Sequence, residues 1–316
     1  MADAVIAPPA PESSPLPPAR TGAAGVQVHS AVPYASLDGA RPLKLDLYLS
    51  PSEKDCPAVV FIHGGGWRMG SRRAVGPLYA GASPSPFEQL AQAGIAVASM
   101  DYRLSGEAVW PAQLHDVRSA LAWVRSRAPE LRVDPTRLAT WGESAGGHLA
   151  LMAALTEAED AAEDADGSSG DAPLAACVAW YPPADLAAVP ADLGADPSAT
   201  DTREALLLGA ALDADPERTA DASPITHVTG AAPRTLLLHG EADPLIPAVQ
   251  SERLADRMAD AGVDVRRRTY PGAGHLWLDS PDAAAAALAE TIAFLTETLQ
   301  TETLQTETLQ SDWETQ

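Results

Sequence analysis

The strongest constraint on the fold is an alternation of apolar runs with amphipathic segments that lasts from residue 26 to residue 295. Continuous apolar runs of strand length, such as AVVFIHG (58–64) and RTLLLHG (234–240), are typical of strands covered by helices on both faces. The segments between them repeat apolar residues at helical spacing, as in LHDVRSALAWVRSRA (114–128). Strands and helices that alternate in this way predict one doubly wound, mainly parallel sheet of the α/β class.

The individual elements can be placed along the chain. We expect about eight strands, at residues 26–30, 43–50, 58–64, 95–103, 137–142, 174–181, 234–240 and 263–272. The first two alternate apolar with polar residues, which is typical of half-buried antiparallel strands. Long helices are expected at residues 114–128, 145–155, 251–262 and 281–295.

Three segments before the end of the chain depart from this pattern. Residues 1–24 are rich in proline and alanine and are expected to be disordered, so the folded domain is placed at 25–298. Residues 157–171 are rich in acidic side chains and predict a solvated surface loop. Residues 183–231 hold no strong strand, so they form either a small lid over a site or a structural flap.

The sequence TETLQ occurs three times in succession at residues 296–310, and residues 299–316 form a low-complexity tail. Five residues advance a helix by about 140° beyond a full turn, so the repeated leucines form no stripe. We therefore expect a frayed extension of the last helix in preference to a coiled coil, with a docking or oligomerising tail as the alternative.

Composition excludes several classes of function. The formal charge of −22 and an isoelectric point near 4.5 argue against binding to nucleic acid or to an anionic membrane surface. Neither a secretion signal nor an apolar run of about 18 residues is present, so we expect a cytoplasmic protein with no membrane partner. Cys56 and Cys177 are expected to be buried free thiols. No clustered ligand set predicts a metal, and we expect no cofactor and a monomer or homodimer.

The motif GESAG at residues 142–146 raises the question of a nucleophile. It follows a predicted strand and opens a predicted helix, which is the setting of a G-x-S-x-G nucleophile elbow with Ser144 at its centre. Small residues are needed at 142 and 146 because the strained turn brings neighbouring segments close. A phosphate loop is disfavoured because no lysine follows the glycines.

The motif HGGGW at residues 63–67 directly follows a predicted buried strand. Backbone N–H groups of its glycines can point at a developing oxyanion, because no Cβ blocks the approach. The N–H of Ala145, which follows Ser144, would complete such an oxyanion hole. A tight glycine turn without chemistry is the alternative for this motif taken alone.

A serine nucleophile needs a base and an orienting carboxylate. Asp243 and Glu241 lie at the carboxyl end of the predicted strand 234–240, and His275 lies in a glycine-rich loop after the next strand. In open α/β sheets, sites lie beyond the carboxyl ends of the strands. We assign the acid to Asp243, which lies further past the strand than Glu241, and the base to His275. Structural roles are expected for the other histidines, with His63 and His239 bracing loops.

These motifs together resemble the hormone-sensitive-lipase-like branch of the α/β-hydrolase superfamily, in particular its small bacterial esterases of the feruloyl- or acetylxylan-esterase-like type. DYRL (101–104), ASPITHV (222–228) and YPGAGH (270–275) add to the likeness, which covers about residues 34–295. The resemblance implies an α/β-hydrolase fold with a nucleophile, an acid, a base and three oxyanion donors at Ser144, Asp243, His275, Gly65, Gly66 and Ala145. The repeat tail, the acidic insertion and the tryptophan of HGGGW depart from the family pattern and leave substrate and assembly open.

The resulting hypothesis is a serine carboxylesterase that hydrolyses short-chain acyl or aryl esters of small molecules through an acyl-enzyme. An arylformamidase-like amide hydrolase is the nearest alternative, and a catalytically silent binding protein on the same fold is another. Aromatic side chains near the motifs are expected to line the substrate pocket: Trp67, Trp110, Trp180, Tyr181 and Trp277.

Overall fold

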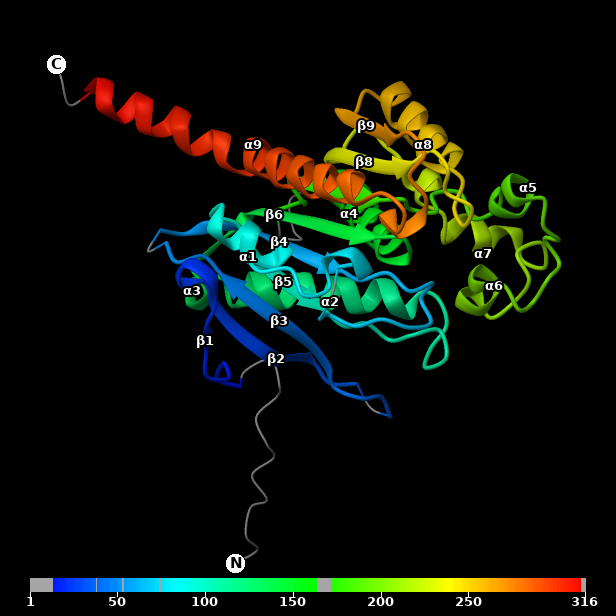
Figure 1. Ribbon diagram of the computed structural model, residues 1–316, viewed down its shortest axis with the longest axis horizontal. Helices are drawn as coiled ribbons and strands as arrows, with labels where there is room; N and C mark the ends of the chain where they lie inside the picture. Colours follow the sequence, from blue (N-terminus) through cyan, green and yellow to red (C-terminus); the bar gives the residue numbers. More distant parts are fainter. Residues whose placement is uncertain (1–13, 38, 53, 74, 164–171, 314–316) are drawn as a thin grey trace, which may run out of the picture.

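A nine-stranded sheet runs through the computed structural model (Figure 1). The structure describes residues 14–37, 39–52, 54–73, 75–163 and 172–313, of which 162–163 and 301–313 are described by their backbone alone. The strand order across the sheet is β1-β2-β3-β5-β4-β6-β7-β8-β9. The strands are β1 (Arg20–Thr21), β2 (Gln27–Ala35), β3 (Leu43–Leu49), β4 (Cys56–Ile62), β5 (Ala96–Met100), β6 (Val133–Glu143), β7 (Ala176–Trp180), β8 (Arg234–Gly240) and β9 (Val265–Tyr270).

Helices cover both faces of this sheet (Figure 1). The α-helices are α1 (Pro86–Gln92), α2 (Ala112–Ser126), α3 (Ala128–Leu131), α4 (Ala145–Glu163), α5 (Val189–Leu193), α6 (Arg203–Leu208), α7 (Pro216–Asp221), α8 (Val249–Asp260) and α9 (Pro281–Trp313). Short 3₁₀ turns are η2 (Ala23–Gly25), η3 (Pro77–Tyr79), η4 (Pro224–His227) and η5 (His275–Trp277). None of the described helices is both long and apolar enough to cross a membrane.

Strand direction divides the sheet into two parts. The pairs β1–β2, β2–β3 and β3–β5 are antiparallel, and every pair from β5 through β4 to β9 is parallel. The predicted α/β class and the mainly parallel sheet are therefore confirmed. The strands that carry the predicted site residues all belong to the parallel part, so their carboxyl ends meet at one edge.

One strand was not expected, and it lies before the predicted start of the domain. Arg20 and Thr21 pair with Val28 and Gln27 of β2. Further back, the carbonyl of Pro17 lies 2.7 Å from the imidazole of His29. A two-residue strand is too short for any hydrophobic period to reveal, so the sequence pattern placed the boundary at residue 24. Residues 1–13 of the expected disordered lead-in lie outside the described residues.

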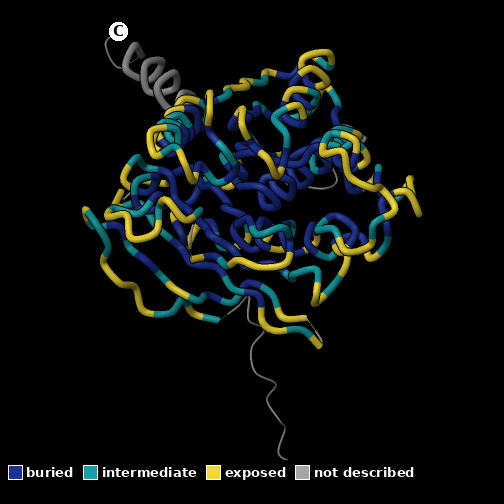
Figure 2. The backbone as a smooth tube through the Cα atoms, turned by 45° about the vertical axis from the view of Figure 1, so that its right-hand side comes forward, coloured by how far each residue is buried: buried dark blue, intermediate teal, exposed yellow. Residues whose placement is uncertain are grey.

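The core has two main layers, one on each face of the sheet, and Figure 2 shows the buried segments gathered in the middle of the molecule. Residues of α2, α4 and α8, among them Leu121, Leu149 and Met258, pack on one face. On the other face, α1 and α9 contribute Phe87 and Leu288. This arrangement explains why the central strands read as continuous apolar runs, since both of their faces are buried.

Both predicted insertions contain helical residues, which corrects the loop prediction for part of the acidic segment 157–171. The first residues of the acidic segment 157–171 belong to α4, which ends at Glu163, and Glu157 pairs there with Arg125 of α2 at 3.0 Å. Residues 164–171 lie outside the described residues. The insertion 183–231 consists of the short elements α5, α6, α7 and η4 between β7 and β8.

The last helix continues through the repeats. Helix α9 ends at Trp313, and its final turns extend beyond the sheet (Figure 1). The expected extension of the last helix is therefore present as regular backbone over these residues.

Candidate active site

Ser144 lies in a sharp turn between the central strand β6 and helix α4. Its backbone φ is +51°, a left-handed conformation that is unfavourable for any residue with a Cβ atom. The turn is held by a hydrogen bond from the Ser144 N–H to the carbonyl of Trp180 on β7, at 2.8 Å. The strand-to-helix setting that the sequence predicted for Ser144 is thus present.

Two glycines make this turn sterically possible. A Cβ on Gly142 would overlap the carbonyl oxygen of Gly146. A Cβ on Gly146 would overlap the carbonyl oxygen of Ile62 on β4. Both obstacles are backbone atoms of packed elements, so neither can rotate away. These contacts are the physical reason for small residues on either side of the serine.

The structure brings Ser144, His275 and Asp243 together. His275 Nε2 lies 2.9 Å from Ser144 Oγ, and His275 Nδ1 lies 2.6 Å from Asp243 Oδ2. An ionised carboxylate only accepts hydrogen bonds, so Nδ1 carries the proton and Nε2 accepts from the serine hydroxyl. The three side chains follow β6, β8 and β9, and all three are buried. This chain of hydrogen bonds can move a proton from the hydroxyl to the imidazole.

Asp243 is fixed as an ionised carboxylate. Its Oδ1 accepts hydrogen bonds from the N–H groups of Leu245 and Ile246, at 2.8 and 2.9 Å. Burial by itself raises the pKa of Asp243, but hydrogen bonds from His239 and His275 outweigh it and hold the pKa well below its ordinary value. Glu241, the alternative acid, is exposed and accepts a hydrogen bond from Thr269 instead.

The loop after β4 supplies unused backbone donors beside Ser144. Gly65 and Gly66 have φ values of +114° and +58°, which a residue with a side chain would adopt only under strain. In the described part of the chain, the N–H groups of both glycines donate no hydrogen bond. The N–H of Ala145 begins α4, where no partner within the helix exists. Gly65, Gly66 and Ser144 border the same cavity.

Glu143 connects this loop to the histidine, and the sequence did not reveal its role. One carboxylate oxygen accepts hydrogen bonds from the N–H groups of Gly64 and Gly76, at 3.4 and 3.1 Å. The other accepts from the Tyr181 hydroxyl at 2.9 Å, and the Tyr181 ring lies 4.6 Å from the ring of His275. Burial raises the pKa of Glu143, an effect that these hydrogen bonds partly offset.

The prediction that aromatic side chains line the substrate pocket is wrong for the cavity at Ser144. None of the five borders it, and all of them are buried: Trp67, Trp110, Trp180, Tyr181 and Trp277. Trp180 and Trp277 pack edge to face beneath the site, 6.0 Å apart. These rings are adjacent to motif residues in the sequence but fill the core, because apolar area is removed from water there.

The cavity above Ser144 has a volume of about 240 Å³. Its lining is made of Gly65, Gly66, Arg68, Met69, Ser144, Arg203, Leu245, His275 and Leu276. Arg203 begins α6, so the insertion between β7 and β8 does reach the site. Arg68 and Met69 directly follow the HGGGW motif, and Leu245 follows Asp243 closely. Their position next to these motifs is the feature of the sequence that could have indicated Arg68, Met69 and Leu245 as lining residues of the cavity.

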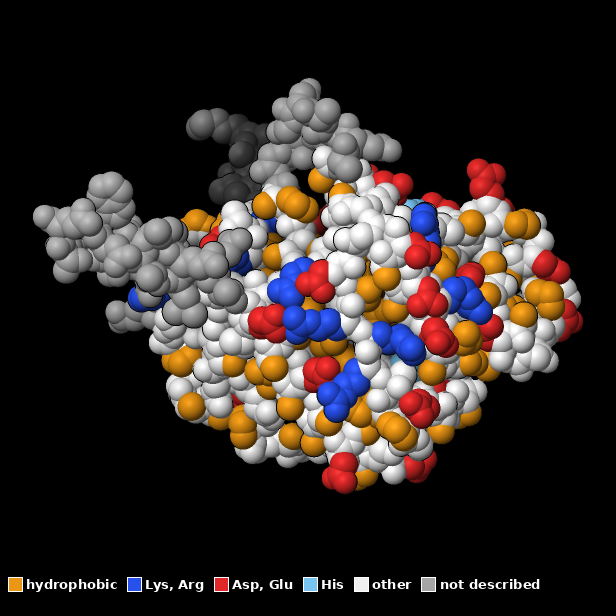
Figure 3. All heavy atoms as spheres, turned by 90° about the horizontal axis from the view of Figure 1, so that it is seen from above, with side chains coloured by type: hydrophobic (Ala, Val, Ile, Leu, Met, Phe, Trp, Pro, Cys, Tyr) orange, Lys and Arg blue, Asp and Glu red, His pale blue; other side chains and the backbone are white. Residues whose placement is uncertain are grey.

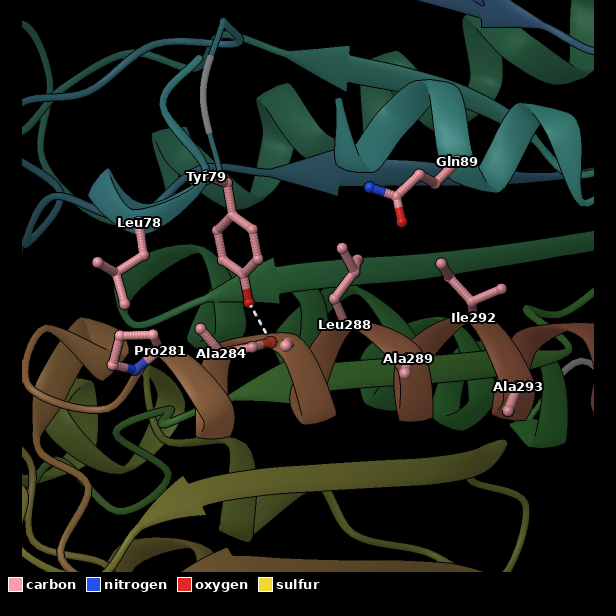
Figure 4. A pocket seen from close by; sticks show the side chains of 10 residues that line it. Leu78, Tyr79, Gln89, Pro281, Ala284, Leu288, Ala289, Ile292 and Ala293 are labelled. Atoms are coloured by element: carbon pink, nitrogen blue, oxygen red, sulfur yellow. Dashed lines mark hydrogen bonds between the residues drawn. The ribbon is translucent and has the colours of Figure 1, made fainter. Parts of the chain in front are cut away.

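A larger cavity lies elsewhere, between η3, α1 and α9, with a volume of about 610 Å³. Figure 4 shows Tyr79 pointing across it and donating a hydrogen bond to the carbonyl of Ala284, at 2.7 Å. Leu288 and Ile292 of α9 form its apolar wall. It holds no nucleophile or charged side chain, so its lining offers no acyl-transfer chemistry.

The remaining buried histidines have structural partners. His63 Nδ1 lies 2.7 Å from the carbonyl of Gly64, and His148 Nε2 lies 2.7 Å from that of Ala222. Burial lowers the pKa of both to about 4. His239 contacts Ser251 and Ile246 and also approaches Asp243 Oδ2 at 3.4 Å. Cys56 and Cys177 are buried and free, as expected. Over the described residues, no group of three or more potential ligands could hold a metal ion.

With this geometry established, comparison with known proteins identifies the family. The family model described as BD-FAE matches residues 45–258. The chain belongs to the BD-FAE family. This BD-FAE match and the esterase-like fold confirm the resemblance to hormone-sensitive-lipase-like members of the α/β-hydrolase superfamily.

Similar proteins carry esterase names. Esterase LipC of Mycobacterium tuberculosis is 35% identical over 227 residues, which is 70% of this chain and 53% of LipC. Esterase LipQ of the same organism is 30% identical over 84% of this chain and 60% of LipQ. The BD-FAE chain thus spans little more than half the length of these curated relatives.

Solved structures of esterases have a fold similar to that of this chain. A truncated carbohydrate esterase from gut microbiota has a TM-score of 0.70 and 30% identity, covering 86% of this chain and 95% of that one. A bacterial heroin esterase has a TM-score of 0.68 and 27% identity, covering 87% and 84% of the two chains.

Proposed function

We propose that this BD-FAE protein is a serine carboxylesterase that hydrolyses short-chain acyl or aryl esters through an acyl-enzyme. The observation that carries the proposal is the uninterrupted line of hydrogen bonds from Ser144 through His275 to Asp243. Esterase names among the relatives, such as LipC and LipQ, support the same reaction class.

In the first half of the reaction, His275 accepts the proton of the Ser144 hydroxyl as Oγ attacks the ester carbonyl. Asp243 keeps the imidazole in the tautomer with Nδ1 protonated and stabilises the imidazolium that forms. His275 then donates the proton to the departing alcohol, and the acyl group remains on Ser144. In the second half, water repeats the attack and releases the acid.

The tetrahedral intermediate places negative charge on the former carbonyl oxygen. We assign its stabilisation to the N–H groups of Gly65, Gly66 and Ala145, which surround the nucleophile and have no other described partner. Each preorganised donor of this kind contributes roughly 3 kcal/mol to the transition state. The small volume of the cavity, about 240 Å³, favours short acyl chains over long ones.

We further propose that the protein acts in the cytoplasm on a small-molecule ester, as a monomer or homodimer without a cofactor. Two free buried cysteines are compatible with a reducing compartment, and the strongly acidic composition favours a soluble small-molecule enzyme over a nucleic-acid binder. Light scattering on the purified chain and cell fractionation test these two statements.

The proposed reaction is tested with p-nitrophenyl acetate and butyrate and with a fluorophosphonate probe. Wild type is expected to hydrolyse both esters and to be labelled at Ser144. Ser144→Ala should lose both activities while unfolding at the same temperature as wild type. Ser52→Ala, a change at an exposed serine that does not line the cavity at Ser144, serves as the matched control. Ester hydrolysis that survives in Ser144→Ala contradicts the assignment, and faster turnover of an aryl formamide than of the aryl ester favours the amide-hydrolase alternative.

A further inference from the structure

The cavity above Ser144 is cationic although the chain as a whole is acidic. Two arginines, Arg68 and Arg203, line it, and none of the described residues that line it carries a carboxylate. The formal charge of the whole chain is −22. An acidic surface repels an anionic molecule, so binding one at the site requires positive charge at the cavity itself.

We propose that this cavity takes esters that carry a carboxylate close to the scissile bond, and that Arg68 and Arg203 bind this carboxylate. The inference rests on the proposed esterase function and specifies its substrate class. A planar guanidinium presents paired N–H donors that match the two oxygens of a carboxylate, which makes arginine the side chain suited to this recognition.

Arg68 is the more available of the two cations. It is exposed and lies directly beyond the HGGGW motif. Within the described residues, its guanidinium makes no hydrogen bond or ion pair. Many arginines elsewhere are paired with carboxylates, as Arg266 is with Glu297 at 2.6 Å, and cations alternate with acidic groups over the face in Figure 3. Arg68 therefore retains its full charge for a ligand.

Arg203 is held in a fixed position next to the oxyanion loop. Its Nη2 donates to the carbonyl of Leu245 at 3.2 Å. Its stem covers Gly66, where an added Cβ would lie 2.9 Å from the arginine Cδ. Glu204 lies 3.6 Å away and offsets part of the charge, but the remaining N–H groups of the guanidinium stay available. Arg203 supplies directed donors, and Arg68 supplies net charge.

The rest of the rim is apolar. Met69 is 63% exposed and Leu245 is 45% exposed, and Leu276 completes the wall. An exposed apolar rim beside two guanidinium groups fits a short hydrocarbon stem that ends in a carboxylate. The carboxylate can belong to the acyl group or to the alcohol, and both sources present the same chemistry to the arginines.

Two matched substrate pairs separate these sources. For the acyl side, p-nitrophenyl hemiglutarate is compared with p-nitrophenyl pentanoate, in which a methyl group replaces the carboxylate. For the alcohol side, 4-acetoxybenzoate is compared with 4-acetoxybenzamide. The measured quantity is the ratio of kcat/KM for the anionic ester to that for its neutral partner, at low and high ionic strength.

We expect one of the two ratios to be about tenfold or more in wild type at low salt, as for a charge-assisted hydrogen bond retained in the transition state. Arg68→Gln and Arg203→Gln should each lower that ratio severalfold, and Arg68→Lys should fall between Arg68→Gln and wild type. Added salt should also lower it, because partly exposed charges are screened. Arg73→Gln, which removes one exposed arginine outside the cavity, is the charge-matched control and should keep the wild-type ratio.

Each result decides between the possibilities. Equal turnover within both pairs, or a preference that both glutamine variants keep, overturns the inference while leaving the esterase proposal intact. A fall of the same size in Arg73→Gln assigns the preference to overall charge and also overturns it. If wild type hydrolyses none of the four esters, or does not react with a fluorophosphonate, the proposed function itself is contradicted.

Discussion

The hydroxyl of Tyr181 donates a hydrogen bond to Glu143 Oε2 at 2.9 Å, and the same tyrosine ring lies against the ring of His275. Glu143 in turn accepts from the backbone of Gly64 and Gly76. Two parts of the proposed catalytic apparatus, the oxyanion loop and the base, are thus connected through one buried carboxylate. The connection identifies Glu143 as a positioning residue that touches no reacting atom.

Replacing this carboxylate should lower the rate of ester hydrolysis more than it weakens substrate binding. In Glu143→Ala the loop that carries Gly65 and Gly66 loses its anchor, and we expect kcat to fall at least tenfold, since displaced oxyanion donors cost about this much or more. Glu143→Gln keeps an acceptor oxygen and should retain most of the activity. The measurement is steady-state kinetics together with the Ki of a trifluoromethyl ketone transition-state mimic.

A purely structural role for Glu143 would give a different result. Loss of stability alone would lower the unfolding temperature while leaving kcat and the inhibitor Ki of the folded fraction unchanged. Tyr181→Phe provides the matched control for one hydrogen bond, because it removes the hydroxyl and keeps the ring against His275. Its kcat should lie between those of wild type and Glu143→Ala.

The choice between two acidic residues gives the second prediction. Asp243→Asn should reduce kcat by about 10³–10⁴, because an amide no longer fixes the tautomer of His275 that accepts the serine proton. Glu241→Gln changes the same charge two residues earlier, at an exposed side chain bonded to Thr269, and should stay within about twofold of wild type. Steady-state kinetics with one aryl ester measures both. A larger loss in Glu241→Gln than in Asp243→Asn would reverse the assignment of the acid.

The catalytic residues that follow the ends of strands could be predicted from the sequence. Ser144, Asp243 and His275 each lie shortly after the carboxyl end of a parallel strand, so their order in the chain was enough to predict that they meet. Glu143 forms contacts with Gly64 and Gly76, which are 79 and 67 residues away, and no local pattern encodes such a pairing.

The prediction that aromatic residues line the substrate pocket was wrong for a local reason. Tyr181 follows β7 and Trp277 follows His275, so both are adjacent to the site in the chain. The backbone turns them inward, with φ of +38° at Tyr181 and +59° at Trp277. Which way a side chain faces after a strand depends on these local turns, and proximity in sequence does not determine it. The pocket is lined instead by residues such as Arg203, contributed by a distant helix.

The sharp turn that carries Ser144 gives a prediction about stability. Gly146→Ala places a methyl group against the backbone carbonyls of Ile62 and His63, and neither can move without displacing β4. We expect at least about 2 kcal/mol of destabilisation, as for overpacking in a core, together with loss of esterase activity. Gly106→Ala is the matched control, since a Cβ there meets nothing and φ is not positive; it should be neutral or slightly stabilising. Chemical denaturation of both variants measures the difference, and equal unfolding midpoints would refute the steric account.

Two buried histidines should make the protein less stable in mild acid. Burial lowers the pKa of His148 and of His63 to about 4, whereas a histidine in the unfolded chain has a pKa of about 6.5. Between these values the unfolded state binds protons that the folded state does not. The free energy of unfolding therefore falls as the pH drops from about 6.5 to about 4, by on the order of 3 kcal/mol for each histidine.

His148→Gln should remove about half of this pH dependence. The glutamine amide can still donate to the carbonyl of Ala222, as His148 Nε2 does at 2.7 Å, but it does not titrate. Urea unfolding at pH 7.5, 5.5 and 4.5 measures the free energy of unfolding, with equal m-values as the check that the unfolded state is unchanged. His115→Gln, at an exposed position, should keep the slope of wild type. If His148→Gln also keeps that slope, His148 takes up its proton in the folded state and its burial does not control acid stability.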